Sequence, residues 1–400
     1  MRSTAAASPT RAAAMTASSI PGAGWAPPVL RPCDGTPPVS PTARPTTRRS
    51  RHDLPRQKQA RHNRHDRNRH DTGVTVSAVQ SVPQYRPLVP ADLPTVCALT
   101  ERAQRHDGVE QVAVLEEFEE EFDDEHVVFA TDTLCAEDPS TGQLLGYAYT
   151  YHLPSEVREE RCYVFGQVDP DHRRQGIGTA FMEWGLRRAA EQLDTSTRDL
   201  PRYIRVDHPE SVTGAAALFA ACGLTVVRFT DELRRPLDSP LETSSPDSVT
   251  IIPWPDDRDD DIRAAKNAAF ADHWGSTPTS AHHWQQMVRG PGSRPDLSRI
   301  AVDATGAVVG HCLVKRFPDD DSVTGRREGW IENLGVRREV RGRGVATALI
   351  GSTIRAMQDD GLTHAVLGVD SENPTGAVGL YTSLGFEPVR RSITHQLQHR

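Results

Sequence analysis

Lysine is almost absent from this sequence. Only three of the 46 basic residues are lysines, at positions 58, 266 and 315. Arginine in their place is typical of GC-rich codon usage and indicates an actinobacterial source. Long apolar runs are missing as well. The longest mainly apolar stretch, 214–227, falls short of the roughly 18 residues that a membrane-spanning helix needs, so we expect no such helix.

Cysteine is sparse and scattered, at positions 33, 97, 135, 162, 222 and 312. No Cys-x-x-Cys pair occurs, which excludes the common zinc and dithiol redox motifs. This usage fits a reducing, cytoplasmic compartment. The adjacent His282 and His283 would diverge by about 100° on a helix and could not face one ion together. We therefore predict no metal site.

The charge of the chain is divided unequally. The first 73 residues hold 13 Lys and Arg against 4 Asp and Glu, whereas the remainder holds 33 against 50. An acidic folded part opposes nonspecific binding to nucleic acid, which depends on neutralising phosphates. We expect neither a nucleic-acid nor a membrane partner for it.

Residues 1–75 form a basic tail that is rich in Pro, Arg and His. Ten prolines lie in its first 55 residues, and the run RHNRHDRNRH follows them without helical or strand periodicity. This composition predicts disorder. Three interpretations stay open for the tail: upstream sequence read from a mis-called start codon, an arm that binds a partner or nucleic acid, and an organellar transit peptide.

After residue 75 the sequence alternates helical patterns with short β-branched and aromatic runs, which predicts a mixed α/β fold. The same order of elements occurs twice. For the first half we expect helices at 93–105, 112–122, 176–193 and 213–221, with strands at 126–131, 144–152, 163–168 and 203–206. For the second half we expect helices at 260–270, 281–289, 344–358 and 376–384, with strands at 299–303, 308–316, 330–336 and 364–369.

Two motifs recur in register between the halves. VDPDHRRQGIGTAFM at 168–182 corresponds to VRREVRGRGVATALI at 336–350, and LFAACGL at 218–224 corresponds to LYTSLGF at 380–386. Two copies of one fold are therefore predicted. We place the first domain at 76–238, a Pro- and Ser-rich linker at 239–248, and the second domain at 249–400.

Each first motif has the composition of an anion site between a strand and a helix. Small residues let the backbone approach a phosphate closely, while the free N–H groups of the first helical turn and the positive end of its dipole face the negative charge. Arginine adds charged donors. Neither copy has Gly-x-Gly-x-x-Gly or a P-loop, which argues against a typical mono- or dinucleotide ligand.

The pattern Val-x-x-x-x-Arg-x-x-Gly-x-Gly/Ala resembles the coenzyme A loop of the GCN5-related N-acetyltransferase (GNAT) superfamily, and Leu-Tyr-x-x-x-Gly-Phe resembles its closing motif. The resemblance covers residues 84–400. It implies two tandem GNAT-type domains of α/β (α+β) class, each with a mixed, splayed sheet flanked by helices, and acetyl-CoA as the acyl donor. The residues that it implies for coenzyme A binding are Leu334, Val336, Arg341, Gly342, Arg343, Gly344, Val345, Ala346, Thr347 and Asn373 in the second copy, and Arg173, Gln175, Gly176 and Gly178 in the first.

Acetyl transfer to an amine needs a proton acceptor more than a proton donor. Deprotonating an amine of pKa near 10.4 at pH 7 costs on the order of 4 kcal/mol, against roughly 2 kcal/mol for releasing a thiolate. The resemblance implies Glu332 as the general base and Tyr381 as the acid. Alternatives stay open: Glu332 could pair with an arginine or face solvent, Tyr381 could be a packing residue, and Asn373 a helix cap.

The repeat alignment places Val164 opposite Glu332 and Phe219 opposite Tyr381. We therefore expect the second copy to catalyse and the first to be a degenerate copy that is structural or binds acetyl-CoA without turnover. Three further features are ambiguous at this point. The acidic run 116–125 could attract a cationic substrate or form a solvated helix face, and Trp274 and Trp284 could line the acceptor pocket or pack beneath it.

The expected activity is transfer of an acetyl group from acetyl-CoA to a primary amine of a small molecule. Two other interpretations remain: a noncatalytic acyl-CoA-binding module, and a protein acetyltransferase that acts on lysines or N-termini. The sequence does not select the acceptor amine, because acceptor specificity is expected to lie in the first helices of each copy and their loops.

Overall fold

The computed structural model describes residues 82–123, 127–153, 157–271, 276, 278–372 and 376–399. The predicted disordered tail lies outside this part of the chain. The elements of the first half are β1 (Gln84–Arg86), α2 (Leu93–Asp107), α3 (Leu115–Phe122), α4 (Phe129–Asp132), β2 (Thr133–Glu137), β3 (Leu144–Leu153), β4 (Glu160–Val168), α5 (Ile177–Asp194), β5 (Arg202–Pro209), α6 (Thr213–Ala221) and β6 (Thr225–Pro236).

The second half repeats this order. Its elements are β7 (Val249–Pro253), α7 (Asp259–Ala269), α8 (Ala281–Arg289), β8 (Arg299–Asp303), β9 (Val308–Arg316), α9 (Asp321–Thr324), β10 (Glu328–Val336), α10 (Val345–Asp359), β11 (His364–Asp370), α11 (Ala377–Ser383) and β12 (Glu387–Gln398). The predicted helix at 281–289 and the predicted strands at 299–303 and 308–316 are confirmed to the residue.

One predicted strand is wrong. The sequence predicts a strand at 126–131, but Phe129–Asp132 is a helical turn and β2 begins only at Thr133. Hydrogen bonds between side chains and backbone hold this turn: Asp132 Oδ2 accepts from the Val128 N–H at 2.8 Å, and Thr133 Oγ1 donates to the Phe129 carbonyl at 2.6 Å. Local capping therefore overrides β propensity here.

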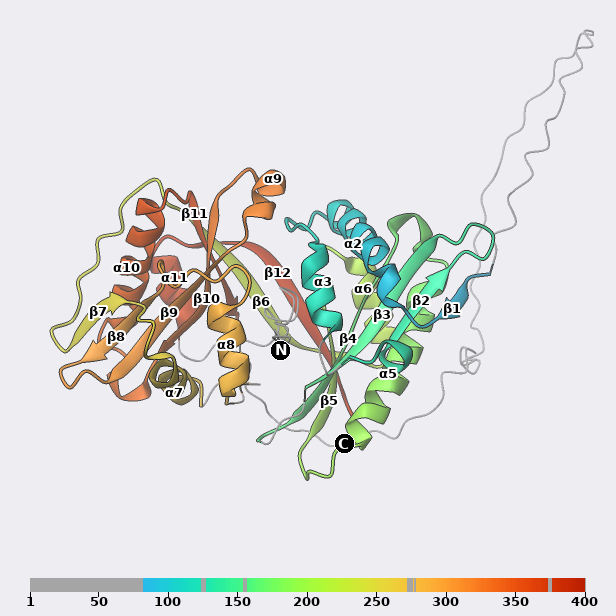
Figure 1. Ribbon diagram of the computed structural model, residues 1–400, viewed down its shortest axis with the longest axis horizontal. Coiled ribbons are helices and arrows are strands. Elements are labelled where there is room, and N and C mark those ends of the chain that lie inside the picture. Colours follow the sequence, from blue (N-terminus) through green and yellow to red (C-terminus); the bar gives the residue numbers. More distant parts are fainter. Residues whose placement is uncertain are drawn as a thin grey trace, which may run out of the picture. The chain divides into compact units, whose positions relative to one another are not determined.

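The twelve strands of the described residues form one sheet, in the order β1-β2-β3-β4-β5-β12-β6-β11-β10-β9-β8-β7. The last strand of each half crosses to the other half. β12 pairs with β5 along its length, and β6 pairs with β11, while β6 and β12 pair with each other at the centre (Figure 1). The two copies thus exchange their final strands.

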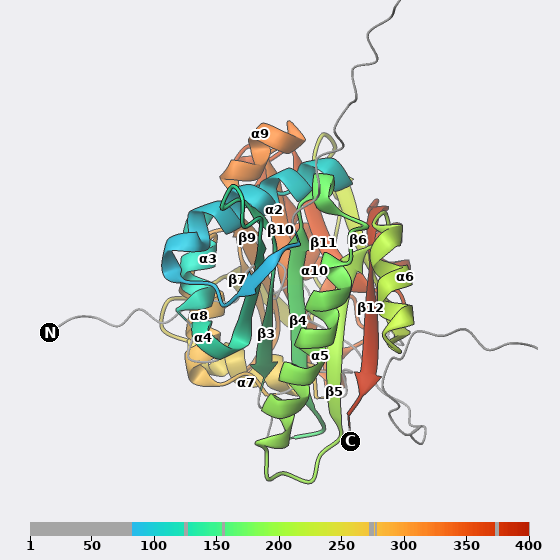
Figure 2. The ribbon, with the colours of Figure 1, turned by 90° about the vertical axis from the view of Figure 1, so that its right-hand side faces the viewer.

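Helices cover both faces of the sheet in each half. In the first half, α2 and α3 pack on the aromatic side chains of β3 and β4, and α5 packs on the opposite face of the same strands (Figure 2). In the second half, α7 and α8 enclose one apolar cluster and α10 and α11 another. Within the described ranges, no helix combines the length and apolarity that a bilayer crossing requires.

Charged groups also join the halves beside the exchanged strands. Glu110, in the loop between α2 and α3, lies 2.5 Å from Arg326 and 2.9 Å from Arg234. The neighbouring Val112 N–H donates to Asp320 at 3.0 Å. The loop that follows the first helix of one copy is therefore anchored on the β9–β10 connection of the other.

Candidate active site

In each half the central parallel strands pair over only four positions and then part. β4 and β5 pair from Glu160 with Arg202 to Tyr163 with Arg205, and β10 and β11 pair from Glu328 to Ile331. Beyond this point the residues of β4 and β5 line a cavity instead of contacting each other. The splayed sheet predicted from the sequence is thus present in both copies.

The Gly-rich turns lie where these parallel strands end, and their backbones correspond closely. Gly176 and Gly344 precede their helices with φ of 86° and 82°, and Arg174 and Gly342 are also left-handed, at 64° and 72°. Among the described residues, nothing accepts a hydrogen bond from the N–H groups of 174–179 or 342–347. Both turns therefore present free donors to an anion.

The arginine of each turn supports the loop itself. Arg173 Nε donates to the Val168 carbonyl at 3.2 Å, and Arg341 Nε donates to the Val336 carbonyl at 3.0 Å. Their other nitrogens reach the end of the first helix of each copy. Arg173 makes a bidentate contact with Asp107 at 2.6 and 2.8 Å, and Arg341 reaches the Ala269 carbonyl at 2.5 Å. These guanidinium groups hold the loop in place and leave the anion to the amides.

The other residues that the sequence assigned to coenzyme A divide between loop and core. Gly342, Arg343 and Gly344 are exposed, Val345 is buried, and Ala346 and Thr347 are half-buried. Leu334 and Val336 pack against the apolar cluster beneath α10. In the first copy, Gln175 is exposed, and a Cβ added at Gly178 would lie 3.2 Å from Leu218. Asn373 and Trp274 lie outside the described residues.

Glu332 lies at a β-bulge. Ile331 is opposite Val314 on β9, and Asn333 is opposite the very next residue, Leu313, so Glu332 has no partner in the ladder. The side chain is half-buried and lines the cavity together with Trp330 and Ile331. No described group forms a hydrogen bond or ion pair with it. The alternative in which Glu332 pairs with an arginine therefore finds no support within the described chain.

Tyr381 is buried, with 8% of its surface exposed, and packs edge-on against Phe386 at 6.0 Å between ring centroids. Burial, followed by the nearby Cys312 thiol, raises the pKa of its hydroxyl, which stays protonated at neutral pH. It is absent from the lining of the cavity that contains Glu332. The structure thus does not bring the two predicted proton carriers together in one cavity.

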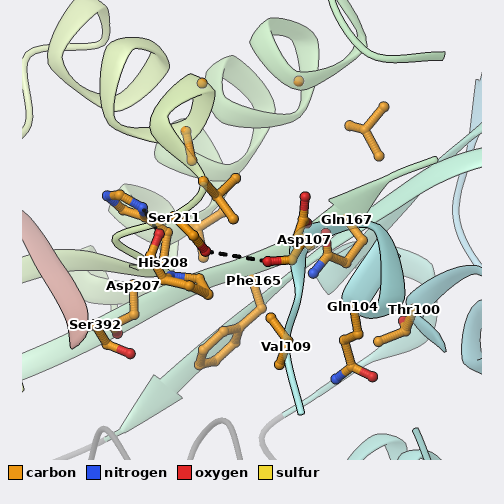
Figure 3. Close-up of a pocket in the computed structure, with 18 of the residues that line it drawn as sticks. Thr100, Gln104, Asp107, Val109, Phe165, Gln167, Asp207, His208, Ser211 and Ser392 are labelled. Atoms are coloured by element: carbon orange, nitrogen blue, oxygen red, sulfur yellow. Dashed lines mark hydrogen bonds between the residues drawn. The ribbon is translucent and has the colours of Figure 1, made fainter. Parts of the chain in front are cut away.

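The cavity has a volume of about 1020 Å³ and follows the opening between β4 and β5. Its lining includes Gly176, Phe165 and His208 of the first copy and Glu332 and Gly368 of the second copy. Figure 3 labels Asp207 and His208 next to each other among the residues that line this cavity, in the same part of the view as Phe165. No group of three or more His, Cys, Asp or Glu side chains suited to a metal occurs in the described part of the chain.

Two polar residues of this cavity were not singled out from the sequence, and two others belong to the acidic run 116–125. Asp207 and His208 follow the paired part of β5. Glu121, 1% exposed, accepts a hydrogen bond from the Tyr149 hydroxyl at 2.7 Å, and it and Glu117 line the cavity. The acidic helix is therefore not wholly a solvated face. The available signal was the pair Asp-His at the end of a predicted parallel strand, where ligands commonly bind.

Comparison with known proteins gives the same picture. The model of the acetyltransferase (GNAT) family matches residues 96–223 and again 260–386. This chain belongs to the GNAT acetyltransferase family. It is an acyltransferase that uses acetyl-CoA as the donor, and its two tandem GNAT domains confirm the predicted fold class.

Its relatives also extend over both copies. A mycothiol acetyltransferase of Salinispora arenicola is 34% identical over 263 residues, covering 64% of this chain and 78% of that protein. One of Catenulispora acidiphila is 28% identical over 82% of this chain and all of that protein. A GCN5-related N-acetyltransferase structure from Sphaerobacter thermophilus aligns at 27% identity with a TM-score of 0.63, covering 80% of this chain and 96% of that one.

Proposed function

We propose that the second GNAT domain transfers the acetyl group of acetyl-CoA to a primary amine of a small molecule, with Glu332 as the general base and Tyr381 as the acid. The observation that carries this proposal is the position of Glu332. It is a carboxylate without a described partner, at a bulge of the splayed strand, in the wall of a cavity. Such a carboxylate is free to accept a proton from an incoming amine.

The proposal assigns one role to each of these groups. The free amides of 342–347 bind the diphosphate of the donor. The acceptor amine attacks the thioester carbonyl while Glu332 removes its proton, directly or through water. Tyr381, whose raised pKa keeps it protonated, then supplies a proton to the departing thiolate. Asn373 is proposed to contact the pantetheine arm.

The acceptor is proposed to be a small molecule because Glu332 lies in a cavity wall and not on an open face. The mycothiol acetyltransferases among the relatives make the cysteine-capped pseudodisaccharide of mycothiol synthesis the first compound to test. The tandem architecture is similar to that of mycothiol synthase, while no residue described above recognises this acceptor specifically.

The test measures free-thiol release from acetyl-CoA over a panel of the pseudodisaccharide, polyamines, amino acids and aminoglycosides. With the best acceptor, Glu332→Gln should lower kcat by about 10²- to 10⁴-fold, and Tyr381→Phe by a smaller factor, because the thiolate is a good leaving group. Coenzyme A affinity should not change in either variant. Full turnover in both variants would refute the assignment, and coenzyme A binding without thiol release for any amine would indicate a binding module.

A further inference from the structure

The cavity in the first domain is lined by hydrogen-bond donors and acceptors from different elements. The turn of 174–179 offers backbone N–H donors that no described residue accepts from. On β5, Asp207 Oδ2 and His208 Nε2 are shielded from solvent and lack hydrogen-bond partners in the described chain. The cavity therefore suits a ligand that carries both an anionic group and N–H donors.

Asp207 lies on β5 just past the last residue that pairs with β4. Its Oδ1 accepts a hydrogen bond from the hydroxyl of Thr394 on the exchanged strand β12, which fixes the carboxylate. Its Oδ2 is left without a partner. Burial raises the pKa of this carboxyl to about 6 against the lowering effects of Thr394 and Arg205. Asp207 is therefore ionised at pH 7.5, yet more basic than an exposed carboxylate.

His208 presents a second acceptor. It is 5% exposed, and its Nδ1 lies 2.8 Å from the Pro209 carbonyl. Because a carbonyl can only accept, Nδ1 carries the hydrogen and Nε2 holds the free lone pair. The ring packs against Phe219 with centroids 5.6 Å apart. An unsatisfied buried acceptor is unfavourable, so a ligand with N–H groups would relieve both residues.

The charge of the side chains that line the cavity also favours a ligand with N–H donors. Besides Asp207, the cavity wall includes Glu117 and Glu121 from α3 and Glu332 from β10, while Glu232 of the same wall is paired with Arg390. An excess of carboxylates raises the local concentration of cations. The donor-bearing group of the ligand is therefore a cationic amine, which carries several N–H donors.

We propose that the first domain is a second acetyl-transfer site, which takes a polycationic primary amine and uses Asp207 as its general base. Val164 and Phe219 stand where the second domain has Glu332 and Tyr381, and Asp207 supplies the missing base from the neighbouring strand. This goes beyond the proposed function, with which it shares the donor and a cavity that Glu332 also lines.

The reaction is balanced by the groups present. The amine in its neutral form attacks the thioester carbonyl, the N–C bond forms, and the C–S bond breaks. The surplus proton on nitrogen passes to Asp207 Oδ2, and the thiolate leaves and takes a proton from water. His208 Nε2 accepts an N–H of the bound amine and orients it.

The experiment uses the full chain with the second domain disabled by Glu332→Gln, acetyl-CoA as donor and spermidine as the probe amine. We expect saturable residual thiol release. In this background Asp207→Asn should lower its kcat at least 100-fold, and His208→Gln should raise the KM for spermidine about tenfold. Asp132→Asn is the matched control, because Asp132 is a buried carboxylate of the same domain that pairs with Arg188 and does not line the cavity. It should leave the residual rate within twofold.

Two results would overturn the second site: residual release that survives Asp207→Asn, or no residual release from a Glu332→Gln protein that still binds coenzyme A. The assignment of the second domain fails separately, when Glu332→Gln retains full turnover with every acceptor. Loss of that turnover on Asp207→Asn would then support the site in the first domain alone.

Discussion

The two domains agree in their backbone and differ in their side-chain chemistry. Both turns have left-handed residues at corresponding positions, and both turn arginines bind the carbonyl at the end of the preceding strand. The proton carriers do not correspond. In the repeat alignment, Glu332 of the second domain corresponds to Val164, and Asp207 of the first domain corresponds to Val369. The two copies thus share the turn backbone that an amide site for an anion requires, and they differ in the side chain proposed as the base.

The exchanged strands make each domain depend on the other, because neither domain completes its own sheet. β11 is covered by β6 of the first domain, whose Leu233 is 1% exposed and belongs to the apolar cluster of the second. A chain cut before β7 would expose the edge of β11 and open that cluster. Exposed strand edges of this kind favour aggregation.

The largest expected effect is therefore loss of the fold on separating the domains. A fragment of residues 241–399 alone should show no cooperative unfolding transition in circular dichroism. Co-expression with residues 82–240 should restore a soluble complex, because each fragment supplies the strand that the other lacks. A fragment 241–399 that unfolds cooperatively as a monomer would show that β6 is dispensable and contradict the exchange.

The second prediction separates strain from binding at the turns. Gly344 and Gly306 both have φ of 82° and open space around an added Cβ, but Gly306 lies in the β8–β9 turn, away from the site. Gly344→Ala and Gly306→Ala should lower the unfolding free energy alike, by about 1–2 kcal/mol. Only Gly344→Ala should weaken coenzyme A binding to the second domain, by about tenfold or more.

Isothermal titration of coenzyme A measures this effect, and Gly176→Ala gives the reciprocal experiment. Each site variant should reduce the high-affinity stoichiometry from two to one, while Gly306→Ala keeps it at two. Equal weakening by Gly306→Ala would mean that general strain, and not the turn amides, controls the affinity.

Much of the fold could be predicted from the sequence, because the strands of the sheet interior and the long helices have strong periodicity. Strands β6 and β12 were not predicted. Both strands carry charged residues at positions that look exposed in either half alone; their sequences are TVVRFTDELRRP and EPVRRSITHQLQ. Their pairing depends on the other domain, and Arg391, for example, pairs with Asp231 across the two strands at 2.6 Å. Such long-range compensation leaves no local pattern.

For the site, the repeat predicts the two turns and the position of Glu332 on its strand. It does not predict which residues surround them. The bulge at Glu332 depends on the register with β9, which periodicity does not give. The burial of Asp207 depends on Thr394, almost 190 residues away. The roles of Glu332, Tyr381 and Asn373 stay predictions until the variants are measured.

The last expected effect is a change in how stability depends on pH, and it tests the burial of Asp207 in the first domain. Its pKa is raised to about 6 in the folded chain, mainly by burial, so the folded state favours the protonated form. This contribution is fully present below the unfolded pKa and is lost as the pH rises through 6. Asp207→Asn removes this titration, so in urea unfolding the free energy of unfolding of the variant should rise relative to the parent between about pH 4 and pH 6 and level off above, by no more than about 3 kcal/mol in total. Because the other groups titrate in both proteins, they cancel in this difference. A difference that stays constant with pH would mean that Asp207 is solvated in the cavity, and would remove the reason for treating it as a tuned base.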